Sequence, residues 1–277
     1  MKNLLQLFAI GLILITITAC SPTLHSIGAA ALPSPVVHRA TSDSAVSGVE
    51  LTASGFWAHN FDADNIKDMD AGGGNFSATY RLGKVFFVNA AVGGFGGSLK
   101  FSCDEDADCN DIVTFTNSEK QKTYSINGSD NYNDWLKAGG GKQTNDFMNL
   151  QERILLGIDA NLGKYFILGV AAGVQAFQGD GDYEDYREAL GDLGYINNAD
   201  DKIDFGIVSA WWIGLRFGKN GKYGNFSIEF DNMYKGTLDE WTSNRKYTYA
   251  HPTGFFGGIT EGDLMSFGLF AGKQFVF

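Results

Sequence analysis

Residues 148–178 read MNLQERILLGIDANLGKYFILGVAAGVQAFQ and contain two long stretches in which apolar side chains alternate with small or polar ones. A period of two is typical of a β-strand with one apolar face, and Gly163-Lys164 between the stretches predicts a tight turn. Each stretch has about fifteen residues, whereas strands of soluble proteins usually have about five or six. The pattern therefore favours strands that cross a membrane. The apolar face of the first stretch comprises Met148, Leu150, Ile154, Leu156, Ile158, Ala160 and Leu162.

The same alternation recurs along the chain and predicts eight strands, at residues 49–60, 73–82, 84–100, 147–162, 164–178, 202–217, 223–235 and 263–277. Tight turns near residues 83, 163 and 218–222 alternate with long connections at 61–72, 101–146, 179–201 and 236–262. Short turns on one side and long loops on the other are the layout of small outer-membrane barrels. We therefore expect an all-β fold, an eight-stranded antiparallel up-and-down transmembrane β-barrel over residues 49–277.

The last strand supports this expectation. Its apolar face ends in Phe275 and Phe277, and only Lys273 departs from the apolar register. This ending resembles the C-terminal signature by which outer-membrane barrels are recognised for insertion, although a chance amphipathic strand would look the same. In its architecture the region 49–277 is similar to the superfamily of eight-stranded outer-membrane barrels typified by the OmpA transmembrane domain.

The first residues predict where the protein is exported and how it is anchored. Lys2 precedes an apolar run of signal-peptide length, which ends in Ile17-Thr18-Ala19-Cys20. These four residues resemble a bacterial lipobox, which implies removal of residues 1–19, a palmitate-bearing lipid on Cys20 and, because Ser21 replaces Asp, transfer to the outer membrane. Residues 20–48 are rich in Ser, Ala, Pro and Thr, and this composition predicts a flexible tether on the periplasmic side. A plain cleaved signal peptide is the alternative.

Composition excludes some partners and suggests others. The chain carries 32 acidic and 21 basic residues, a net charge of -11 that argues against binding nucleic acid. We expect outer-membrane lipids, the assembly and lipoprotein-sorting machineries and an extracellular ligand or surface as partners. No resident cofactor is predicted except calcium, for which Asp104, Asp106 and Asp108 could supply oxygens; solvated surface charge is the simpler interpretation.

Two further sets of residues carry predictions. Cys103 and Cys109 remain once Cys20 is lipidated, and we expect them to form a disulfide in an oxidising compartment. Polar residues opposite the apolar faces would fill the interior, where buried charges must pair or form a conducting path. This lumen charge network comprises Arg81, Arg153, Arg216, Glu50, Asp159, Asp204, Glu229 and Asp231.

Three functions remain open. The leading hypothesis is a non-enzymatic lipoprotein whose barrel displays acidic loops for surface interaction, adhesion or envelope integrity. The second is a barrel that transports or binds a small solute. The third is an envelope lipid-modifying enzyme that uses His59, at the outer end of the first strand, or His251, in the last loop. A lipid-tethered soluble calyx of the lipocalin type is the main alternative fold.

Overall fold

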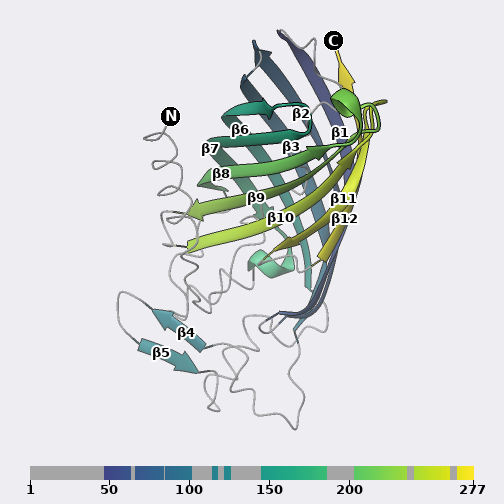
Figure 1. Ribbon diagram of the computed structural model, residues 1–277. Helices are drawn as coiled ribbons and strands as arrows, with labels where there is room; N and C mark the ends of the chain where they lie inside the picture. Colours follow the sequence, from purple (N-terminus) through teal and green to yellow (C-terminus); the bar gives the residue numbers. More distant parts are fainter. Residues whose placement is uncertain are drawn as a thin grey trace.

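Ten antiparallel strands pair into a closed barrel in the computed structural model of the chain (Figure 1). The structure describes residues 47–63, 66–83, 85–101, 114–117, 122–125, 145–185, 203–235, 240–262 and 267–277. Barrel strands are β1 (Ser47–Ala63), β2 (Ile66–Leu82), β3 (Phe86–Phe101), β6 (Asn145–Leu162), β7 (Phe166–Asp180), β8 (Ile203–Arg216), β9 (Asn225–Lys235), β10 (Glu240–Ala250), β11 (Phe255–Gly262) and β12 (Phe267–Val276). The remaining elements are a hairpin of β4 (Thr114–Asn117) and β5 (Lys122–Ser125), and the 3-10 helix η3 (Lys219–Gly221).

Closure comes from the first and last strands. β1 pairs with β12 from Glu50 opposite Val276 to His59 opposite Phe267, so the start of β1 and the end of β12 lie at the same end of the barrel. The tight turns lie at that end too, and we call it the turn end; the opposite end is the loop end. Gly83 and Gly163 have φ of 69° and 71°, which confirms the two turns predicted there.

The predicted number of strands is wrong. Residues 240–262, which we placed in a long connection, form β10 and β11 instead. On β10 the outward face holds Ser243, Arg245 and Tyr247 and the buried face holds Asn244 and Lys246, so neither face is apolar and the expected alternation is missing. The predicted connection at 61–72 is also wrong, because β1 and β2 extend through most of it.

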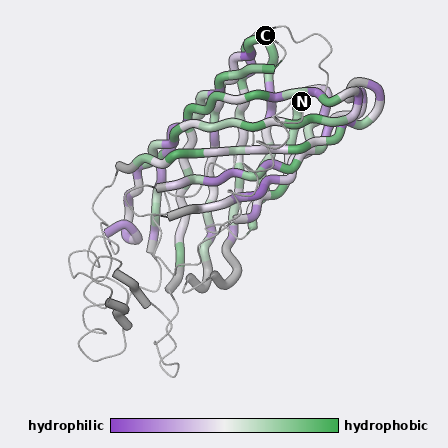
Figure 2. Tube along the Cα trace, turned by 60° about the vertical axis from the view of Figure 1, so that its left-hand side comes forward, coloured by the Kyte–Doolittle hydropathy of each residue, from purple (hydrophilic) through white to green (hydrophobic). Residues whose placement is uncertain are grey.

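The two faces of the wall differ as a membrane barrel requires. On β6 the inward residues Asn149, Gln151 and Arg153 are buried, whereas the outward residues Leu150 and Leu156 are 49% and 62% exposed. The same outward exposure of large apolar side chains holds on β2, β3, β7, β8 and β12, and Figure 2 shows hydrophobic and hydrophilic residues alternating along the strands. A contiguous apolar surface of this kind fits hydrocarbon rather than water.

Bulky inward side chains lie along the wall. A Cβ added to Gly169 would lie 2.1 Å from Trp212 Cε2, and one added to Gly157 would lie 2.5 Å from Phe87 Cζ. Each glycine is the cross-strand partner of the ring that covers it. These rings therefore rest on the backbone of the neighbouring strand instead of projecting across the barrel. On β3 the burial of Phe87 and the exposure of Phe86 show that Phe87 points inward and Phe86 outward.

Candidate functional site: the barrel interior

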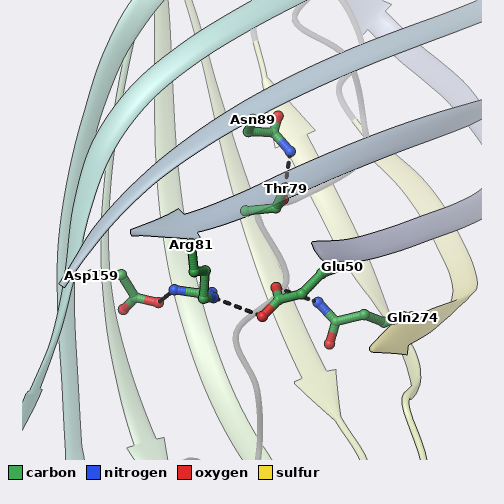
Figure 3. A network of polar contacts seen from close by, with 6 residues as sticks. All are labelled: Glu50, Thr79, Arg81, Asn89, Asp159 and Gln274. Atoms are coloured by element: carbon green, nitrogen blue, oxygen red, sulfur yellow. Dashed lines mark hydrogen bonds and ion pairs between the residues drawn. The ribbon is translucent and has the colours of Figure 1, made fainter. Parts of the chain in front are cut away.

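A cluster of charged residues joins the strands at the turn end (Figure 3). The Arg81 guanidinium on β2 donates from Nε to Glu50 Oε1 on β1 at 2.7 Å and from Nη1 to Asp159 Oδ2 on β6 at 2.9 Å. Gln274 Nε2 on β12 donates to the second oxygen of Glu50 at 3.1 Å. All four side chains are buried, so the Arg81 cation joins three strands inside the barrel and Glu50 adds the fourth through Gln274.

A second charged cluster lies farther from the turns. Lys246 Nζ donates to Glu229 Oε1 at 3.2 Å and also to Asp231 Oδ2, and Arg153 Nη1 lies 3.5 Å from that same Asp231 oxygen. The four side chains are at most 2% exposed and carry two positive and two negative charges. Because the signs balance, the cluster has the composition that a buried charge group needs.

Most residues of the predicted lumen charge network fall into these two clusters. The structure brings Arg81 to Glu50 and Asp159, and Arg153 to Asp231 with Glu229 nearby. Arg216 is buried at the turn end of β8. Asp204 lies on β8 opposite Phe177, and its side chain lies outside the described residues.

Lys246 is the functional residue that sequence analysis missed. The long connection expected at 236–262 includes Lys246, because β10 has no apolar face to reveal it as a strand. A signal was present nevertheless, since Asn244, Lys246 and Thr248 alternate, and Lys246 lies directly opposite Glu229 in the strand register. A search for polar alternation complementary to β9 would have found it.

Toward the loop end the interior becomes aromatic. Phe95 packs edge-to-face against Phe56 at 5.8 Å and against Phe147 at 6.1 Å between ring centroids. Tyr183, in a single helical turn after β7, joins the same cluster and is 1% exposed. This part of the lumen is therefore apolar, unlike the charged part nearer the turns.

Two buried amides border the aromatic part. Asn149 on β6 lies opposite Phe95 and is 1% exposed, and Asn75 on β2 is 7% exposed. Neither the oxygen nor the nitrogen of either side-chain amide has a hydrogen-bond partner among the residues that the structure describes. Buried polar groups in a protein core are nearly always paired, so both amides are unusual for a sealed interior.

The two histidines that we considered catalytic lie apart. His59 Nδ1 lies 2.8 Å from Asp70 Oδ1 on the outer wall near the loop end, and its ring stacks against Trp57. The placement of His251 in a long external loop is wrong, because it lies in the tight turn between β10 and β11 with Nδ1 2.8 Å from Thr253 Oγ1. The two rings therefore do not form one site.

Several predicted sites lie outside the described residues: Cys20, the pair Cys103 and Cys109, and the calcium candidates Asp104, Asp106 and Asp108. In the part of the chain that the structure describes, no group of three or more His, Cys, Asp or Glu residues could hold a metal ion. No helix among the described residues is long and apolar enough to cross a membrane.

The end of β12 lies on the outer wall. Phe275 and Phe277, the predicted insertion signature, are 49% and 75% exposed at the turn end. Lys273 turns back to the wall, where Nζ donates to the carbonyl oxygen of Thr253 at 2.6 Å and lies 3.7 Å from the centroid of the Phe255 ring.

No protein-family model and no curated protein matches the chain. Several solved structures are similar to it at low sequence identity. The outer membrane protein OprG from Pseudomonas aeruginosa is 11% identical, with 83% of this chain and 96% of that one covered and a TM-score of 0.36. An outer membrane channel from Pseudomonas putida F1 is 9% identical, with 92% and 100% covered and a TM-score of 0.40. The translocator domain of the autotransporter NalP from Neisseria meningitidis is 8% identical, with 83% and 87% covered and a TM-score of 0.34. Similarities of this size carry no argument about function, which rests on the barrel itself.

Proposed function

We propose that the chain is a bacterial outer-membrane barrel that admits small polar or amphipathic solutes into its lumen. The outward apolar surface supports the membrane location, since side chains such as Phe205 and Ile207 are 65% and 61% exposed. An interior of ten strands is also wider than the interior of eight, which side chains alone can fill.

One observation carries the proposal. The inward amides of Asn75 and Asn149 are buried beside the aromatic cluster of the loop end, and no side chain or backbone group in the described ranges pairs with them. A barrel that served only as an anchor would gain by replacing such groups with apolar ones, because each unpaired buried amide costs about 1–3 kcal/mol. In a barrel that admits solutes, the same amides would form hydrogen bonds with a polar solute in the lumen.

The charged cluster at the turn end bears on how a solute would leave the lumen. Arg81 links Glu50 and Asp159 across the inner wall, and Gln274 extends the network to β12. We propose that this cluster narrows the lumen, so that solutes enter at the loop end and leave slowly past a charged constriction. Anchoring through Cys20, and display of acidic loops for adhesion or envelope integrity, concern residues outside the described ranges and stay predictions.

Swelling of vesicles that contain the purified full-length protein tests the proposal. We expect vesicles to swell in small neutral solutes faster than protein-free vesicles, and Asn149→Leu together with Asn75→Leu to slow this swelling. Asn232→Leu is the matched control, because Asn232 lies on the outward face of β9. Swelling no faster than that of protein-free vesicles, or equal swelling by the inward and outward variants, would remove the solute function.

A further inference from the structure

The outer wall carries a polar patch formed by Arg245 and Tyr247 on β10 and Glu261 on β11. Arg245 Nη1 lies 3.4 Å from Glu261 Oε1, and the Tyr247 hydroxyl donates to the same oxygen at 2.8 Å. The two charged side chains are 59% and 43% exposed. They therefore point away from the lumen and lie open on the outer surface.

This polar patch lies where a membrane barrel faces hydrocarbon. β10 ends at Ala250 on the side of the turns, and Arg245 lies five residues before that end. At about 3.3 Å per residue and a tilt of about 40°, that places it about 13 Å above the turns, near the middle of an apolar band about 25 Å tall. An Arg side chain that faces lipid at the midplane destabilises a barrel.

We propose that a second copy of the chain covers the polar patch and forms a two-fold symmetric dimer in the membrane. The patch holds one cation beside one anion, so a two-fold rotation brings Arg245 of one copy toward Glu261 of the other. Flat aromatic surface adjoins it, because Phe230 stacks on Trp211 at 4.0 Å and lies 5.9 Å below the Arg245 guanidinium. The inference rests on the membrane location proposed above.

Charge also distinguishes this occupant from an anionic lipid. A phosphate that approached Arg245 would meet the Glu261 carboxylate 3.4 Å from the guanidinium, together with a hydroxyl that already donates to that carboxylate. Opposed pairs from a second copy meet no such repulsion. Polar groups within a membrane generally face other protein and pair there, as this arrangement would allow.

Photo-crosslinking of the full-length protein in cells is the first test. Benzoyl-phenylalanine replaces Tyr247 in one variant and Val92 in the matched control. Val92 is a suitable control because it points outward, is 43% exposed and lies on β3, which is five strands from β10 in either direction around the barrel. We expect a product with the mass of two chains from position 247 and none from position 92. Absence of that product at 247, or equal yield at both positions, overturns the dimer.

Complementation by opposite charges is the second test. Arg245→Glu makes the polar patch wholly acidic and Glu261→Arg makes it wholly basic, so each variant alone should dimerise at least about tenfold more weakly than wild type because like charges repel. Mixing the two, with different tags, should restore a heterodimer in light-scattering measurements, which pairing within one chain cannot explain. Gel mobility without boiling checks that each variant folds. Failure to form the heterodimer from folded variants refutes the inference, whereas a chain that stays dissolved without detergent refutes the membrane location instead.

Discussion

Replacing Lys246 with Met should destabilise the barrel strongly, because the ammonium neutralises two carboxylates that water does not reach. Lys246 contacts Glu229 and Asp231, which are 1% and 0% exposed. Arg153 remains 3.5 Å from Asp231, but the contact between the Lys246 ammonium and Glu229 is lost. Removing one partner of a buried ion pair costs about 3–5 kcal/mol. With a urea slope of about 2 kcal/mol/M, the unfolding midpoint should fall by about 2 M.

Unfolding of the barrel in detergent micelles, followed by tryptophan fluorescence, measures this loss. Lys164→Met is the matched control, because Lys164 is exposed in the turn between β6 and β7, and its effect should stay within about 0.5 kcal/mol. A loss below about 1 kcal/mol for Lys246→Met would show that the second charged cluster is solvated, and the reasoning from burial would be refuted.

Three other substitutions test separate parts of the structure. Gly169→Ala places a Cβ 2.1 Å from the Trp212 ring, so the free energy of unfolding should fall by about 1–3 kcal/mol and the tryptophan fluorescence should shift. Gly72→Ala is the control and should change neither, because no atom would lie closer than 3.7 Å to its Cβ. Arg81→Met removes the cation between Glu50 and Asp159 and should raise bilayer conductance while lowering stability by about 3–5 kcal/mol; unchanged conductance would contradict the constriction. Tyr249→Phe loses the hydroxyl that donates to the Tyr223 carbonyl at 2.6 Å, and the urea midpoint should report a loss of about 0.5–1.5 kcal/mol.

The sequence predicted strands wherever one face is apolar. On β6 and β7 the lipid-facing residues alternate with inward Asn149, Arg153 and Gln175, and the predicted faces agree with burial in the structure. On β10 the outward residues include Arg245 and Tyr247, so the pattern that reports contact with lipid is absent. A rule that relies on contact with hydrocarbon cannot find strands whose outer face is polar.

The candidate site was predictable in its residue types but not in its pairings. The alternation predicts that Arg81, Glu50 and Asp159 all point into the interior. In the sequence, however, Arg81 lies 31 residues from Glu50 and 78 residues from Asp159. Only the strand register decides which charges meet. Sequence alone could not show that the amides of Asn75 and Asn149 lack a hydrogen-bond partner within the described part of the chain, because that depends on every neighbouring side chain.

Spin labels placed singly along β10 test most directly whether these strands belong to a closed barrel in a membrane. The account predicts a period of two: labels at Ser243 and Tyr249, which lie on the outer face but outside the polar patch, should respond to oxygen dissolved in the lipid, and labels at Asn244, Lys246 and Thr248 should not. Uniform accessibility of all these positions to a water-soluble relaxation agent would place the segment in a loop and contradict the ten-stranded barrel.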